Sequence, residues 1–308
     1  MSSSHDADAQ LLSSEALRAQ FGALDLDVLL QTDDGARVSC LRRAEDGTPL
    51  ACSVVRFNSS GAAALGVHHD RILRGALLGE TVDRSGVAYR RFVSVSTASP
   101  TTYATRFLFD TEAAQLRSRI VEYEVAGMPY CRIREMYSPS FFSTVGYASS
   151  RIETDVMPFV IARLRPSYGE AYLRLAHGFL QKDMHVGIKD EDVFMQETRE
   201  TLSHLLDDVN THLFVAADDQ QFIGYIALNI HPALHLNGFE CVVRELYVRA
   251  PARRHGVASA LNAYTERFAR GRKCKRLALA TNWEDEVQRG FYESAGFARR
   301  CDLVAKPL

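Results

Sequence analysis

The sequence predicts an α/β (α+β) protein with two domains, an antiparallel-sheet domain followed by one in which strands alternate with helices. The chain has 308 residues, enough for two buried cores. Strand-like runs joined by turn signals dominate its first half, whereas apolar strands and amphipathic helices alternate in its second half. These observations divide the chain into a polar tail and short helix at 1–22, a first domain at 23–150 and a second domain at 154–308.

Two Asp-Gly turns organise the start of the first half. An Asp-Gly pair between apolar runs is typical of a β-hairpin, because these residues tolerate the positive φ of a tight turn. The pairs are Asp34-Gly35 and Asp46-Gly47. With the other turn signals they predict, in order, a helix at Ser14–Gly22, strands at Asp27–Leu30, Arg37–Leu41 and Leu50–Phe57, a helix at Asp70–Leu78, and strands at Arg90–Ser96, Arg119–Val125 and Tyr130–Tyr137.

The second half alternates short apolar runs with longer stretches of helical periodicity, which is typical of an α/β domain. A stretch rich in Ser, Gly and aromatic residues, 138–151, precedes it as the linker. We expect, in order, a strand at Val156–Arg163, helices at Tyr168–Gln181 and Glu191–Val209, strands at His212–Ala217, Phe222–Asn229 and Cys241–Val248, a helix at Gly256–Arg270, a strand at Arg276–Thr281, a helix at Glu284–Ser294, and a strand at Ala298–Val304.

Composition and charge narrow the functional class. A formal net charge of −2 provides no basic field for nucleic acid or an acidic membrane. No apolar run approaches the roughly 18 residues of a membrane span, and the polar start is unlike a secretory signal. The six cysteines are scattered, without metal-ligand spacing. We expect a cytoplasmic protein with free thiols, no bound metal, and no nucleic-acid or membrane partner.

The segment Glu245–Ala258 has the features of a phosphate-binding turn. An apolar strand ends, a turn carries Arg253-x-x-Gly256-x-Ala258, and a helix follows directly. The N–H groups at a helix start point toward one place, and the positive end of the helix dipole adds to their attraction for a diphosphate. Gly256 and Ala258 keep the backbone accessible, while Arg253 and Arg254 add charged donors.

With these motifs the second half resembles the GNAT N-acetyltransferase superfamily. The turn matches the family pattern Gln/Arg-x-x-Gly-x-Gly/Ala, and the family signature Phe-Tyr-x-x-x-Gly-Phe stands here as Phe291-Tyr292-Glu-Ser-Ala-Gly296-Phe297. The resemblance covers about 155 residues. It implies a mixed sheet flanked by helices, acetyl-CoA as co-substrate, and direct transfer of an acyl group to an amine.

The resemblance also implies roles for individual residues. Tyr292 would protonate the leaving thiolate, and Glu245 would be the general base, with His231 and His235 as alternative bases. In relatives an Asn-x-x-Ala segment precedes the tyrosine, but here Asp285 and Gln288 stand at those positions, and Asn282 lies nearby. The implied acetyl-CoA contacts are Leu246, Tyr247, Val248, Arg253, Arg254, His255, Gly256, Val257, Ala258, Asn282 and Asp285.

The first half resembles the chorismate lyase/UTRA-like fold. The resemblance rests on Leu50–Val55 after a Gly-Thr-Pro turn, on Leu77-Leu78-Gly79 and on Gly127–Pro139. It implies that Glu135 is an active-site residue and that Leu78 lines the pocket through its backbone. The arginine that binds the substrate carboxylate would fall at about Cys52, which leaves Arg56, Arg90 and Arg91 as substitutes.

Three functions are compatible with these patterns. The first is an acetyl-CoA-dependent N-acetyltransferase that acts on a primary amine of a small molecule, with a first domain that shapes or regulates the site. The second adds lyase activity in the first domain, and the third is a non-catalytic regulator that binds acyl-CoA or another ligand. Tyr292 and the complete turn favour an enzyme. The protein is a candidate homodimer, and the sequence does not identify the acceptor.

Overall fold

The computed structural model describes residues 14–31, 35–93, 97–142, 159–182, 190–281 and 284–299. The chain divides into two compact units by its internal contacts. The first unit comprises Met1–Val160 with Asp218–Gln221, and the second comprises Ile161–Ala217 with Phe222–Leu308.

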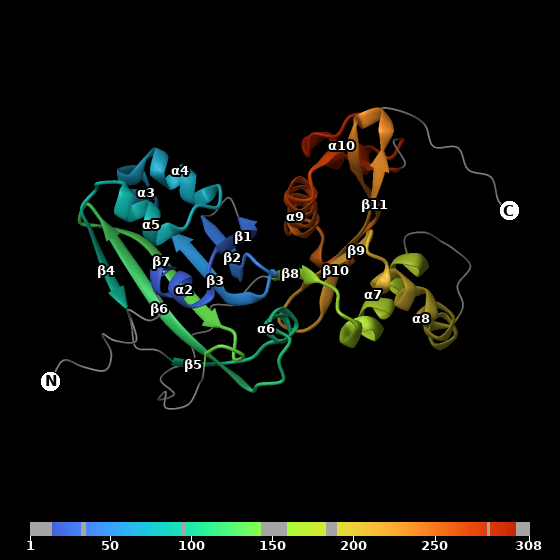
Figure 1. Ribbon diagram of the computed structural model, residues 1–308, viewed down its shortest axis with the longest axis horizontal. Coiled ribbons are helices and arrows are strands. Elements are labelled where there is room, and N and C mark those ends of the chain that lie inside the picture. Colours follow the sequence, from blue (N-terminus) through green and yellow to red (C-terminus); the bar gives the residue numbers. More distant parts are fainter. Residues whose placement is uncertain are drawn as a thin grey trace. The chain divides into compact units, whose positions relative to one another are not determined.

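The first unit is an antiparallel sheet with short helices packed beside it (Figure 1). The strand order is β1-β2-β3-β7-β6-β4, and β5 pairs with β6. The strands are β1 (Leu24–Gln31), β2 (Ala36–Arg43), β3 (Pro49–Phe57), β4 (Tyr89–Val93), β5 (Thr97–Pro100), β6 (Gln115–Val125) and β7 (Met128–Tyr137). The helices are α2 (Ser14–Phe21), α3 (Ser59–Leu65), α4 (Val67–Leu73), α5 (Leu78–Arg84) and α6 (Tyr103–Phe109). The expected antiparallel-sheet domain is confirmed.

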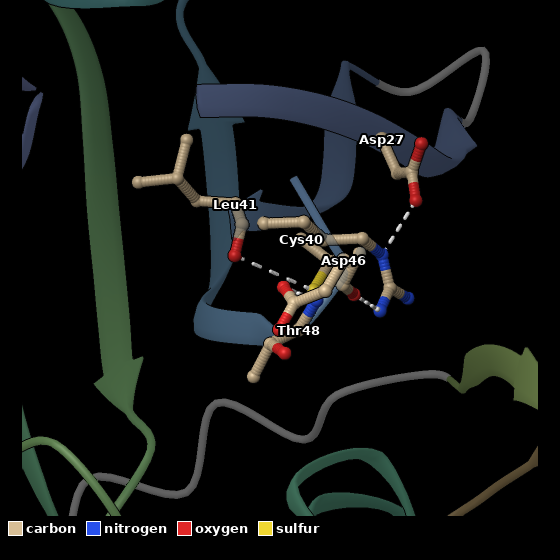
Figure 2. A network of polar contacts seen from close by, with 7 residues as sticks. Asp27, Cys40, Leu41, Asp46 and Thr48 are labelled. Atoms are coloured by element: carbon tan, nitrogen blue, oxygen red, sulfur yellow. Dashed lines mark hydrogen bonds and ion pairs between the residues drawn. The ribbon is translucent and has the colours of Figure 1, made fainter. Parts of the chain in front are cut away.

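Side chains hold the first strands in register (Figure 2). Asp46 accepts a hydrogen bond from the backbone N–H of Thr48 at 3.0 Å and pairs with Arg43 in the turn after β2. Across β1 and β2, Arg42 Nε donates to Asp27 Oδ2 at 2.6 Å. Because a slip of one residue would turn every side chain to the opposite face, this register decides which residues of β2 and β3 share a face.

The expected single helix at Asp70–Leu78 is wrong. Helix α4 ends at Leu73 and α5 begins at Leu78, because Gly75 between them takes a φ of 102°, which no helix contains. The expectations also omit α3 and α6. Each has seven residues, too few for a clear 3.6-residue period.

The second unit is a mixed sheet with helices on both faces (Figure 1). Its strand order is β12-β11-β10-β9-β8, in which β9, β10 and β11 are antiparallel neighbours and β11 and β12 are parallel. The strands are β8 (Val160–Arg163), β9 (Thr211–Ala217), β10 (Phe222–Ala233), β11 (Gly238–Val248) and β12 (Cys274–Leu279). The helices are α7 (Gly169–Lys182), α8 (Glu191–Asp207), α9 (Val257–Gly271) and α10 (Glu286–Ser294), with short 3₁₀ turns at Pro166–Tyr168, Leu234–Leu236 and Ala250–Ala252.

From β8 to α10, the expected order of strands and helices in this half is confirmed, as is the mixed sheet flanked by helices. The expected last strand at Ala298–Val304 lies mostly outside the described residues, and Ala298 and Arg299 are not in a strand. In the described ranges, no helix is both long and apolar enough to cross a membrane. The same ranges contain no group of three or more His, Cys, Asp or Glu that is placed to hold a metal ion.

His212 of β9 is a buried histidine in apolar surroundings. It is 2% exposed, and its ring centroid lies 4.7 Å from that of Phe268 and 6.5 Å from that of Phe214. Neither ring nitrogen has a hydrogen-bond partner in the described part of the chain. Burial, with the nearby charges of Arg163 and Arg272, lowers the pKa of His212 from 6.5 to about 4. The folded chain therefore keeps this imidazole neutral at pH values where the unfolded chain protonates it.

We expect His212 to weaken the second unit as the pH falls from 6.5 to about 4, because only the unfolded state takes up the proton in that range. The loss is at most about 3 kcal/mol in the free energy of unfolding. His212→Leu should remove this part of the pH dependence. Urea unfolding of both chains at about pH 7.5 and about pH 5 measures it, and an equal loss in both chains would contradict the prediction.

Candidate active site

Strand β11 has strand partners on both sides over only part of its length. It pairs with β12 from Phe239 to Val243, whereas its pairing with β10 continues to Val248. From Arg244 to Val248, the edge that faces away from β10 has no strand partner among the described residues. Unpaired N–H and C=O groups on such an edge can bind an extended ligand that contains amides.

A β-bulge in β11 marks the point where β11 and its parallel neighbour β12 separate. Ala227 pairs with Glu245 and Leu228 with Val243, so Arg244 is the additional residue. Its Nε donates to Asn229 Oδ1 at 2.9 Å. Bulges bend a strand and re-aim its side chains. The bulge therefore sets the direction of Glu245 and of the free edge that follows.

Glu245 lies beside buried aromatic side chains. The hydroxyl of Tyr225, on β10, donates to Glu245 Oε2 at 2.8 Å, and Tyr172 of α7 packs on Tyr225 with ring centroids 5.0 Å apart. Burial and the charge of Glu245 raise the pKa of Tyr225 well above its ordinary value, so this hydroxyl remains a donor. The Glu245 side chain is exposed, and its Oε1 has no partner in the described ranges. The carboxylate is thus fixed by one oxygen and open at the other.

The turn after β11 leads into an uncapped helix. Gly256, with a φ of 79°, is the N-cap of α9 and supplies no side-chain hydrogen bond. Arg254 also has a positive φ, of 63°. Both residues and His255 are exposed, whereas Val257 is buried and anchors the helix start. Since no side chain caps the first turn, its N–H groups form a site suited to an anion.

Arg253 and His255 help to shape this turn. Arg253 Nε donates to the carbonyl oxygen of Val248 at 2.8 Å, and its guanidinium lies over the Tyr247 ring at 5.8 Å. The Nδ1 atom of His255 lies 2.8 Å from the carbonyl oxygen of Arg253. Arg253 therefore ties the turn to the end of β11, a role that the sequence does not reveal.

The Gly-Phe pair of the C-terminal signature forms a helix end that holds Tyr292. Gly296 has a φ of 84°, and its N–H donates to the Glu293 carbonyl at 3.0 Å. The N–H of Phe297 donates to the Tyr292 carbonyl at 2.9 Å, and the two rings lie 5.6 Å apart. This is a Schellman motif with its hydrophobic contact. Burial raises the pKa of Tyr292, so its hydroxyl carries a proton at neutral pH.

Asp285 lies at the start of the same helix, where its Oδ1 accepts from the N–H groups of Val287 at 2.9 Å and Gln288 at 3.1 Å. The structure thus gives this carboxylate a capping role. Asn282, the other expected contact in this region, lies outside the described residues.

The alternative bases His231 and His235 belong to another part of the sheet. His231 Nε2 lies 3.3 Å from Glu240, and His235 Nε2 lies 3.0 Å from Arg276. On β10, His231 is four residues from Ala227, which pairs with Glu245, a separation of about 13 Å along a strand. Glu245 remains the candidate base beside the free edge. No pattern in the sequence points to Tyr225 or Tyr172, because their contacts arise only across strands and between helix and sheet.

In the first unit, the two expected pocket residues line one cavity of about 410 Å³. Leu78 covers it from α5, and Glu135 lies in the sheet, ion-paired with Arg119 and accepting from the Tyr137 hydroxyl at 2.7 Å. Burial opposes ionisation, but Arg119 and these hydrogen bonds lower the pKa of Glu135.

Of the positions considered for an arginine clamp, only Arg91 lines this cavity. Ala51, Ser53 and Val55 of β3 line the cavity and alternate with Cys52, so Cys52 faces the opposite side of the sheet. Arg56 and Arg90 are exposed and do not line it.

A bare helix start directly after a strand with a free edge is typical of α/β domains that bind an extended, phosphate-containing ligand. Residues 180–297 match the acetyltransferase (GNAT) family. The chain therefore carries a GNAT acetyltransferase domain, and the uncapped turn and the signature of α10 both lie within the matched segment. No curated protein matches the chain.

Several solved structures resemble about half of the chain. A transcriptional regulator from Bacillus halodurans C-125 is 19% identical, with a TM-score of 0.44, over 49% of this chain and 99% of that one. An aminoglycoside acetyltransferase from an uncultured soil metagenomic sample, in complex with trehalose, is 19% identical with a TM-score of 0.40, over 49% and 95%. A ribosomal-protein-alanine N-acetyltransferase from Brucella melitensis biovar Abortus 2308 is 19% identical with a TM-score of 0.39, over 49% and 99%.

Proposed function

We propose that the second unit binds acetyl-CoA and transfers its acetyl group to a primary amine of a small molecule. The observation that carries this proposal is the uncapped start of α9 at Gly256, directly after the free edge of β11. The diphosphate of acetyl-CoA fits the uncapped helix start, and its amide-containing arm fits the free edge of β11. The near-neutral charge of the chain supports a small molecule as the partner rather than nucleic acid or a membrane.

Three groups of this chain have roles in the proposed transfer. Glu245 takes a proton from the acceptor ammonium, so that a neutral amine attacks the acetyl carbon. Backbone N–H groups on the free edge at Leu246–Val248 stabilise negative charge on the acetyl oxygen. As the C–N bond forms and the C–S bond breaks, Tyr292 protonates the departing sulfur and recovers a proton from the new amide.

Calorimetric titration with acetyl-CoA tests the phosphate site. We expect the wild-type chain to bind, and a chain with Arg253→Glu and Gly256→Glu to bind at least about 100-fold more weakly, because both changes place negative charge where the diphosphate would lie. Arg270→Glu, in the last turn of the same helix, is the matched control and should bind like the wild type. Undiminished binding by the double variant would exclude this phosphate site. A screen of amines that reports free thiol then identifies the acceptor.

For the first unit we propose a chorismate lyase/UTRA-like domain that shapes or regulates the acetyltransferase. Lyase activity is the alternative, favoured by the position of Glu135 and Leu78 at one cavity. Incubation with chorismate distinguishes them, because a lyase releases pyruvate and a binding domain does not. A non-catalytic acyl-CoA-binding regulator would bind acetyl-CoA but produce no free thiol with any amine.

A further inference from the structure

Three rows of side chains run across the sheet of the first unit and form the floor of the cavity. Strand pairing places Ser39, Ser53, Glu135 and Arg119 in the middle row. One flanking row has Leu41, Ala51 and Tyr137, and the other has Arg37, Val55, Ile133 and Val121, all of which line the cavity. The floor therefore combines one polar row with two mainly apolar rows, and Arg37 lies at the end of one of these.

Most charged groups of the cavity have partners within it. Five arginines and three carboxylates line it: Arg18, Arg37, Arg84, Arg91 and Arg119, and Glu80, Asp83 and Glu135. Arg119 pairs with Glu135, Arg18 and Arg84 pair with Glu80, and the Tyr89 hydroxyl donates to Asp83. The lining has an excess of positive charge, and its carboxylates are already engaged.

Two of the five arginines, Arg37 and Arg119, are buried, and Arg119 is the one that pairs with Glu135. Arg37 is 2% exposed, and it has no ion pair with a carboxylate in the described ranges. Its Nη1 donates to the carbonyl oxygen of Ile72 at 2.5 Å and its guanidinium lies 5.8 Å from the Phe57 ring centroid, while its Nε is buried without a hydrogen-bond partner. Burial lowers its pKa to about 10, so it is still charged at neutral pH. A buried charge without a counter-ion is costly to the folded chain.

We propose that the cavity binds a small organic anion with an apolar body, whose carboxylate pairs with Arg37. A planar carboxylate matches the fork geometry of a guanidinium and would satisfy the orphaned Nε. The hydroxyls of Ser39 and Ser53 are hydrogen-bonded to each other at 2.9 Å, which leaves one of them free to donate to the carboxylate. The side chains of Leu41, Val55 and Ile133 provide apolar contact, and a volume of about 410 Å³ suits a small metabolite.

This assignment does not depend on the resemblance of the first half to a known fold. That resemblance points to Glu135 and would place the clamp arginine at about position 52, where this chain has Cys52, whereas Arg37 lies on the neighbouring strand β2. Glu135 and Arg119 neutralise one another, so they do not supply the charge that an anion requires.

Thermal unfolding of the full-length chain tests the proposal with hexanoate, cyclohexanecarboxylate and benzoate, each beside its neutral primary amide. We expect at least one carboxylate at millimolar concentration to raise the Tm while its amide does not, because a ligand that binds only the folded state stabilises it. Arg37→Met should weaken that binding about 10- to 100-fold by calorimetry. Arg90→Met, which removes an exposed cation outside the cavity, should bind like the wild type.

Two results would overturn the proposal. One is a wild-type chain that responds to none of the three carboxylates, or equally to acid and amide. The other is an Arg37→Met chain that binds within about threefold of the wild type. If Arg37→Met does not fold, the comparison of acid with amide and an Arg37→Lys chain, which keeps the charge but loses the fork, decide the outcome. The chain with Arg253→Glu and Gly256→Glu should keep the response, which separates this cavity from the proposed diphosphate site.

Discussion

We expect Glu245→Gln to lower kcat of the acetyltransferase about 10²- to 10⁴-fold, the range for loss of a general base. The glutamine oxygen can still accept the hydrogen bond from Tyr225, so the local structure should persist. Only the ability to take a proton is lost. The Kd for acetyl-CoA should not change, because the side chain lies outside the phosphate turn. Steady-state rates with an acceptor from the amine screen, measured across pH, provide the test.

The pH profile distinguishes a base from a residue with only a structural role. The wild-type and variant rates should respond differently to pH, because the variant lacks the group that takes the proton. Glu266→Gln changes an exposed carboxylate on α9 and should leave both rate and profile unchanged. If Glu245→Gln reacts within about threefold of the wild type, or has the same pH profile, another group accepts the proton.

Gly61→Ala should destabilise the first unit by about 1–3 kcal/mol or more in the free energy of unfolding, despite the preference of helices for alanine. Gly61 is a buried residue of α3 that packs directly on β7. A Cβ there would lie 2.5 Å from Tyr130 Cα and 2.7 Å from the Pro129 carbonyl oxygen. Backbone atoms cannot rotate away, so the helix would have to move from the sheet.

Gly290→Ala is the matched control, since this glycine is also helical. A Cβ at Gly290 meets nothing within 4 Å, so the substitution should stabilise α10 by up to about 1 kcal/mol. Urea unfolding with hydrogen exchange can assign each change to its own unit. Equal effects of the two substitutions would show that helix propensity, and not the contact with β7, controls position 61.

Local patterns predicted the turn at the start of α9, because every group in it comes from one short segment. Arg253, Gly256 and Val257, the first residue of α9, lie within one stretch of five residues, so their spacing is enough to place them together. The Schellman end of α10 is similar, since Gly296 and Phe297 act on a tyrosine in the preceding turn. Such features need no knowledge of tertiary structure.

Features that depend on strand pairing were not predicted. The partner of Glu245 is Tyr225, twenty residues earlier in the sequence, and only the bulge at Arg244 gives their register. Arg37 becomes a cavity residue because β3 lies beside β2 and β7 lies beside β3, although β7 begins some ninety residues later. A single sequence does not specify which strands are neighbours, so neither residue could be recognised before the sheet was known.

The position of β8 matters to anyone who shortens this chain. The segment that matches the acetyltransferase family begins at residue 180, in the last turn of α7, yet β8 lies twenty residues before it and is the neighbour of β9 in the sheet. All seven residues of β9 are buried. A truncated chain that starts at residue 180 would expose β9 as a long apolar edge, a template for aggregation. A catalytic fragment intended for expression should therefore begin at or before Phe159.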